Sequence, residues 1–175
     1  MVKEPKIAQD WPTDLMLAAN EYLFLESKVN SLISQACRGF CRECKDRCCR
    51  KEYCSESVSS YWLRIIWTLC GNDISDYDEE KGWISPYGCD LTAGRPPVCY
   101  DFLCNRILEE NPMGAYAASL IKICKLPGYM GKNALGTRHL VTLSSKEVFY
   151  LVNFNRLRNR IAKGLELCEQ CEKQL

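Results

Sequence analysis

Thirteen cysteines in a chain of 175 residues constrain the fold more than any other feature of the sequence. Six of them fall between Cys37 and Cys54, and three more lie between Cys89 and Cys104. A chain of this length folds without covalent staples, because it buries about 70% of the surface that its unfolded form exposes. The cysteines therefore need another explanation, and disulfides, a metal centre and buried packing thiols are the three candidates.

The start of the chain favours a reducing compartment. It reads Met1-Val2-Lys3-Glu4-Pro5 and lacks the basic, then apolar, then small-residue order of a secretory signal. We therefore expect a cytoplasmic protein, in which disulfides are rare. An odd number of cysteines also leaves one thiol over, although a chain already trimmed of its signal keeps disulfides open as an alternative. The sequence contains no run of eighteen apolar residues, so we expect no membrane span.

The first cysteine cluster has ligand-like spacing. If the preceding helix continued, the positions i, i+4, i+7 and i+11 would place four thiols on one face; if Gly39 ended it, the thiols would converge from a compact loop. In either case several sulfurs come close enough to share a metal, and cysteine thiolates hold both zinc and iron–sulfur clusters. The cluster runs Cys37-x3-Cys41-x2-Cys44-x3-Cys48-Cys49-x4-Cys54.

The residues around this cluster favour ionised sulfur. Six basic and three acidic side chains between Arg38 and Glu52 give a local net charge of +3, and neighbouring cations lower the pKa of thiols. A nucleic-acid surface with the metal as scaffold is the rival interpretation. It is not favoured, because only Phe40 and Tyr53 are available there for base stacking and the whole chain carries a net charge of only +1.

A second cluster follows downstream, at Cys89, Cys99 and Cys104. The rigid sequence Gly94-Arg95-Pro96-Pro97 separates its first two members. Two cysteines that flank such a turn suit a second pair of ligands brought against the first cluster from a distant segment. Arg95 is placed to hydrogen-bond or screen the thiolates.

Together these motifs resemble a known family. The Cys-x2-Cys-x3-Cys-Cys run from Cys41 to Cys49, the pair Gly88-Cys89 and the stretch from Gly94 to Phe102 are similar to the zinc- or iron-chelating cysteine-cluster family (YkgJ-type). That family includes the cysteine-rich part of flagellin lysine N-methylase. The resemblance covers about residues 37–104 and implies a protein that holds zinc, iron or an iron–sulfur cluster through several cysteines. It does not extend to the methylase activity, because no matched residue belongs to a methyl-donor site.

The resemblance also implies a set of ligands, and zinc and an iron–sulfur cluster stand as equal expectations for the metal. The leading functional expectation is a metal-binding protein whose metal fixes the fold or presents an interaction surface. An iron–sulfur redox or radical enzyme component is the alternative, so the sequence leaves open whether the protein is an enzyme. The sequence identifies no partner, and another protein is the one class of partner that it leaves open. The expected ligands are Cys41, Cys44, Cys48, Cys49, Cys89 and Cys99, with Cys37 and Cys104 as additions.

Apolar periodicity predicts a mainly helical single domain over residues 1–175, with the cysteine core at about 37–104. Long helices at 14–36, capped by Thr13, and at 145–172, opened by a Ser144–Glu147 capping box, are expected to pack together. Their charges are opposite, −2 over 14–36 and +4 over 145–163. Further expectations are helices at 57–70, 100–110 and 112–125 and a short strand at 140–143.

The remaining chemistry-bearing residues are expected to be structural. His139 is the only histidine and follows a glycine-rich loop, which favours a surface or packed role over a catalytic one. Cys70, Cys124 and the Cys168-x2-Cys171 pair lie on predicted helices and are expected in the core. The acidic run from Asp73 to Glu80 lacks calcium-loop spacing, so it is expected to be a solvated connection.

Overall fold

The long first helix forms as α1 (Thr13–Ala36). The computed structural model describes residues 11–37, 49–86, 88–101, 103, 107 and 114–174. The predicted N-cap, Thr13, is instead the first residue of the helix. The N-cap is Pro12, because its carbonyl already accepts a helical hydrogen bond from the amide of Met16. Its buried face carries the apolar positions that recur every three or four residues, including Leu15, Ala18, Tyr22, Leu25, Val29 and Leu32.

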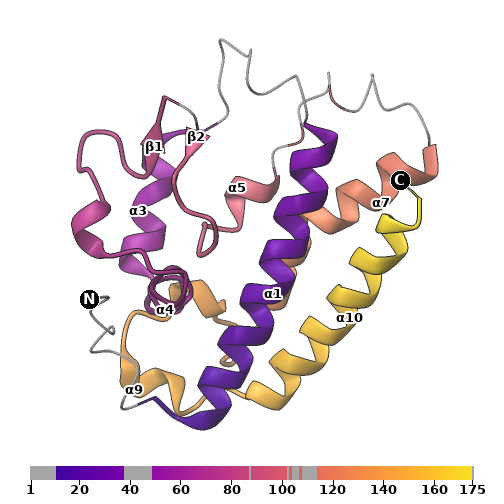
Figure 1. Ribbon diagram of the computed structural model, residues 1–175. Coiled ribbons are helices and arrows are strands. Elements are labelled where there is room, and N and C mark those ends of the chain that lie inside the picture. The colour runs from indigo at the N-terminus through magenta and orange to yellow at the C-terminus, as the bar shows by residue number, and fades with distance from the viewer. Residues whose placement is uncertain are drawn as a thin grey trace.

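The final helix, α10 (Phe154–Glu172), packs against α1 as predicted, and the two run side by side in the same direction (Figure 1). Gly164 permits this close approach, since a Cβ at that position would lie 3.2 Å from Leu25 Cδ1. Opposite charges also meet across the pair. Arg158 donates to both carboxylate oxygens of Glu21, and Lys28 donates to Glu172 at 2.7 Å.

Two predicted helices are interrupted at residues whose side chains cap the next helix. The helix expected at 57–70 is instead α3 (Lys51–Ser59) and α4 (Tyr61–Leu69), because extended Ser60 accepts a hydrogen bond from the amide of Leu63. The helix expected at 145–172 is divided into α9 (Lys146–Phe149) and α10. Asn153 starts α10 by accepting from the amide of Arg156. The N-cap of α9 is Ser145, not Ser144, and its side chain makes no cap hydrogen bond.

The prediction of a strand at 140–143 is wrong. The segment forms a short 3₁₀ helix, η3 (Leu140–Thr142). The ring of His139 determines this outcome, because its Nδ1 accepts a hydrogen bond from the amide of Val141. The apolar run Leu140 to Leu143 has the composition of a strand, but one capping side chain at its start favours the helical turn.

The remaining elements are short and connect the helices. Residues 74–89 form η2 (Ile74–Asp76) and a small antiparallel hairpin of β1 (Ile84–Ser85) and β2 (Gly88–Cys89). Of the helix expected at 100–110, α5 (Val98–Asp101) forms and most later positions lie outside the described residues. The helix expected at 112–125 is α7 (Gly114–Cys124), followed directly by α8 (Leu126–Met130).

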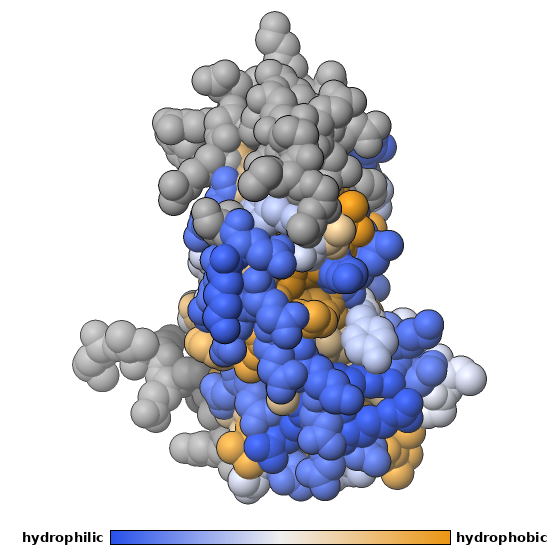
Figure 2. All heavy atoms as spheres, turned by 90° about the vertical axis from the view of Figure 1, so that its right-hand side faces the viewer, coloured by the Kyte–Doolittle hydropathy of each residue, from blue (hydrophilic) through white to orange (hydrophobic). Residues whose placement is uncertain are grey.

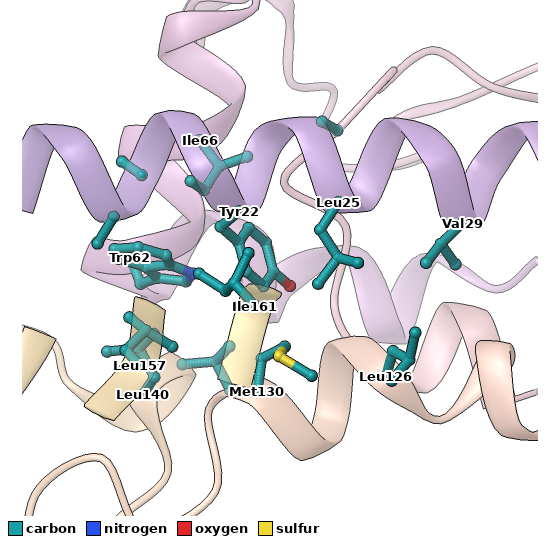
Figure 3. Packing of buried hydrophobic residues seen from close by; sticks show 14 of the residues in the cluster. Tyr22, Leu25, Val29, Trp62, Ile66, Leu126, Met130, Leu140, Leu157 and Ile161 are labelled. Carbon is teal, nitrogen blue, oxygen red and sulfur yellow. The ribbon is translucent and has the colours of Figure 1, made fainter. Parts of the chain in front are cut away.

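One hydrophobic core joins these helices and confirms a mainly α, single-domain protein. In Figure 3, Tyr22 and Leu25 of α1 face Trp62 of α4 and Ile161 of α10. Each fully buried side chain of this size contributes roughly 1.5–3 kcal/mol through the hydrophobic effect. Within the described residues, no helix combines the length and the apolar character needed to cross a bilayer.

Candidate metal centre

A small satellite core holds the hairpin against α3 and α4. Cys54, Trp67, Trp83 and Leu91 form it, and it lies apart from the main core. Ser57 links its two tryptophans, since its carbonyl accepts from Trp67 Nε1 at 3.1 Å and its hydroxyl from Trp83 Nε1 at 2.7 Å. The hairpin that carries Cys89 is therefore fixed in position by buried aromatic rings and satisfied indole donors.

Four thiols from three segments belong to this region. Cys54 of α3 lies in the satellite core and Cys89 of β2 packs against it, while Cys49 precedes α3 and Cys99 lies on α5. Desolvation and, after it, the thiols of Cys89 and Cys54 raise the pKa of Cys99 to about 12. The pKa of Cys89 also rises, mainly through desolvation and in smaller part through the thiols of Cys54 and Cys49. The thiols of Cys49 and Cys54 therefore act on the same two groups, Cys89 and Cys99.

Arg95 is the cation of this neighbourhood. Its charge lowers the pKa values of Cys89 and Cys99 and so opposes the effect of desolvation. The guanidinium is held in place by donating from Nε to the carbonyl of Leu91 at 2.7 Å and from a terminal nitrogen to Asn30 Oδ1 at 3.3 Å. These two hydrogen bonds hold the charge that acts on Cys89 and Cys99 in one position.

Glu26 of α1 anchors the segment that carries Arg95. Only 1% of its surface is exposed, and its carboxylate accepts hydrogen bonds from the amides of Gly94 and Arg95 and from the hydroxyl of Tyr100 at 2.5 Å. Burial raises the pKa of Glu26, while these hydrogen bonds and the charge of Arg95 oppose the rise. The contacts join the Gly94–Tyr100 segment to the longest helix.

Sequence reasoning did not single out Glu26. A signal was present, because Glu26 lies four residues after Tyr22 and three before Val29, both of them on the buried face of α1. A carboxylate at such a position needs buried donors, since an isolated buried charge is costly. The donors come from the Gly-Arg-Pro-Pro segment, whose importance the cysteine pattern had indicated independently.

The eight expected ligands fall into three groups. Cys41, Cys44, Cys48 and Cys104 lie outside the described residues. Cys49 and Cys89 raise the pKa of Cys99, and Cys54, whose role the spacing left open, has the same effect. Cys37 follows α1 and packs beside a separate cluster of Ala36, Ile107, Leu120 and Cys124.

The described thiols do not by themselves form a coordination shell. Among the residues that the structure describes, no three histidine, cysteine, aspartate or glutamate side chains are arranged to hold one metal ion. No disulfide joins the described cysteines either. A complete thiolate site would therefore need donors from residues 38–48 in addition to the thiols around Arg95.

The other cysteines pack as expected for core residues. Cys124, Cys168 and Cys171 are buried, with at most 3% of their surface exposed. Desolvation raises the pKa values of Cys124 and Cys168 to about 12. Cys70 is half-buried at the end of α4. Such thiols are poor nucleophiles at neutral pH, because the reactive form is the thiolate.

His139 and the acidic run also have structural roles. His139 Nδ1 accepts from Val141, so Nε2 carries the proton that is donated to the carbonyl of Gly128 at 2.7 Å. Asp73 and Asp78 cap turns by accepting hydrogen bonds from the backbone amides two residues ahead, those of Ser75 and Glu80. His139 thus has the packed position, and the acidic run the connecting position, that the sequence predicted.

Comparisons with protein-family models, with curated proteins and with solved structures gave no match to this chain. The chemistry of the site therefore rests on its own residues.

Proposed function

We propose that this protein binds a metal, either zinc or an iron–sulfur cluster, through the thiols gathered beside Arg95. Cys49, Cys89 and Cys99 are the proposed ligands around Arg95. Further donors come from the other expected ligands, Cys41, Cys44 and Cys48, with Cys37 and Cys104 as additions. Cys54 is close enough to take part. The observation that carries the proposal is that thiols from three segments distant in the sequence act on the same two groups, since Cys49 and Cys54 raise the pKa values of both Cys89 and Cys99.

Such a grouping is unfavourable as free thiolates. Desolvation and repulsion from neighbouring thiols raise the pKa values of Cys89 and Cys99, and among the described residues Arg95 supplies the positive charge that opposes these effects. A divalent cation or an iron–sulfur cluster would compensate several thiolates at once, since coordinating thiols lose their protons to the metal. Arg95 would then balance part of the net negative charge of a thiolate-rich centre.

The resemblance to the YkgJ-type cysteine-cluster family supports the same proposal. The motif Gly94-Arg95-Pro96-Pro97-Val98-Cys99 is the segment that Glu26 anchors, so its residues position both the proposed ligand Cys99 and its neighbouring cation. Membership of that family is part of the proposal. Thiolate ligands suit zinc and iron alike, and the iron–sulfur alternative extends to a redox or radical enzyme component.

The test is to purify the full chain without oxygen and to measure its metal content, visible absorption and thermal unfolding. Zinc with no colour favours the structural metal site, whereas iron with a brown colour favours the cluster. Cys99→Ser is expected to lose the metal and to melt about 10 °C lower, because structural metal binding is coupled to folding and 1 kcal/mol shifts Tm by about 2–4 °C at this size.

Cys70→Ser is the matched control, because it removes a half-buried thiol at the end of α4. It should keep the metal content of the wild type. Unchanged metal content and melting in Cys99→Ser would remove Cys99 from the site. A wild-type protein that contains neither metal, with its thiols paired on titration, would overturn the proposal in favour of disulfides.

A further inference from the structure

A polar hollow of about 480 Å³ lies between α8 and the first half of α10. Hydrophilic residues cover much of the lower part of the face on which α10 lies (Figure 2). Three cations, three asparagines and one tyrosine line the hollow, and no acidic side chain or cysteine does. Its volume is within the range of small-molecule sites, although it is more polar and more open than most.

The cations Arg156, Arg160 and Lys163 lie on one face of α10, at spacings of four and three residues. No ion pair joins Arg156 or Lys163 to an acidic side chain anywhere in the described part of the chain. The acidic partner of this helix segment, Glu21, is engaged by Arg158, which does not line the hollow. The charge of the hollow is therefore available to an anion from solution.

Tyr129 of α8 supplies a flat ring at the same place. Its residue surface is 55% exposed, which is unusual for a large aromatic side chain. The guanidinium of Arg160 lies 5.4 Å from the ring centroid, and the carbonyls of Met130 and Lys132 accept hydrogen bonds from it. Arg160 is thus held on the ring, and the ring in turn is positioned at the edge of the cationic hollow.

The asparagines complete the set of polar groups. Asn153 uses its carbonyl oxygen to cap α10, while Asn155 and Asn159 are exposed and bind no other described residue through their amides. Each amide offers two donors and an acceptor, the combination that matches the edge of a heterocyclic base. Cations for phosphate, a ring for stacking and amides for a polar edge together match one chemical class of ligand.

We infer that this hollow binds a nucleotide unit, with the phosphate against Arg156 and Lys163 and the base against Tyr129. The unit is either a free nucleotide or part of a single strand, since both present the same base and phosphate. An acidic peptide would use the cations but would leave the ring and the amides without a role. The inference does not depend on metal binding.

The test is to titrate the full chain at low salt with each of three ligands separately, ADP, a short oligothymidylate and orthophosphate, and to measure the affinities by isothermal calorimetry. Arg156→Ala combined with Lys163→Ala should weaken binding of ADP or of the oligonucleotide at least tenfold. The control, Arg64→Ala combined with Lys122→Ala, removes two exposed cations from α4 and α7 and should leave the affinity unchanged. Tyr129→Ala should weaken binding, and added salt should weaken it progressively.

Binding of ADP alone would identify a free nucleotide as the ligand, and tighter binding of the oligonucleotide would identify a single strand. Both results support the inference. Orthophosphate that binds as tightly as ADP would overturn it, because the ring and the amides would then contribute nothing. Equal losses in the two double variants, or no binding of either nucleotide ligand to the wild type, would also overturn it.

Discussion

Glu26 joins the longest helix to the segment that carries Arg95 and Cys99. Its carboxylate satisfies the amides of Gly94 and Arg95 and the hydroxyl of Tyr100, all of them at least partly buried. Loss of a shared acceptor leaves each donor without a partner, and this costs more than the hydrogen bonds contribute on balance. One side chain therefore determines how firmly the proposed ligand segment is attached to the core.

We expect Glu26→Ala to lower the free energy of unfolding by about 3–5 kcal/mol, through the stranded donors and the cavity left behind. Glu21→Ala is the control on the same helix, and it should have a much smaller effect because the Glu21–Arg158 pair is part-exposed and screened by water. Urea denaturation measures both. Equal losses in the two variants would show that Glu26 acts only as one charge among others.

At the scale of elements, a glycine turn allows the Arg95 segment to lie against α4. Gly94 has a φ of +76°, and a Cβ there would lie 2.8 Å from the carbonyl oxygen of Leu63 and from the amide nitrogen of Trp67. Those atoms belong to the helix backbone and cannot move aside. Gly71 has a similar φ of +86°, but a Cβ there would meet nothing within 4 Å.

The two glycines form a matched pair of tests. Gly71→Ala should cost about 1–2 kcal/mol, the strain of a left-handed conformation alone. Gly94→Ala should cost about 3 kcal/mol or more, because the clash with α4 adds to the same strain. Thermal unfolding of both variants separates the cost of the left-handed conformation from the cost of the clash. A Gly94→Ala protein no less stable than Gly71→Ala would contradict the close packing of the Arg95 segment against α4.

How far the sequence predicts these elements depends on what ends them. Periodicity located α1 to within one residue, because six turns repeat the same apolar pattern. The breaks at Ser60 and Asn153 each depend on one capping side chain inside an otherwise helical pattern. The sequence alone does not distinguish a serine or asparagine within a helix from one that caps the start of the next helix. His139 converted an expected strand into η3 in the same way.

The site was predictable in part for a related reason. The spacing predicted that Cys89 and Cys99 would approach the first cysteine cluster, and in the structure Cys49 and Cys89 raise the pKa of Cys99. It left Cys54 open and gave Glu26 no role. Both residues act through tertiary contacts. Cys54 packs in the satellite core around Trp83, and Glu26 binds the buried amides of the Arg95 segment.

At the scale of the whole molecule, buried thiols make stability depend on alkaline pH. Desolvation is the main cause that raises the pKa values of Cys124 and Cys168 from 9.0 to about 12, although these residues lie in different parts of the fold. Above pH 9 the unfolded chain loses thiol protons that the folded chain keeps. Their contribution to stability is therefore fully present below pH 9 and is lost as the pH rises through about 12.

We expect the metal-free protein, kept reduced with a chelator present, to lose about 1.4 kcal/mol of unfolding free energy per pH unit for each such thiol above pH 9. Cys124→Ala should make this slope shallower by about that amount, because it removes one of the two buried thiols without placing a polar group in the core. Cys49→Ala, which removes an exposed thiol, is the control. Urea titrations at several pH values give the slopes. A Cys124→Ala slope that matches the wild type would mean that this thiol ionises as easily in the folded chain as in the unfolded one, and that the core around α7 is open to water.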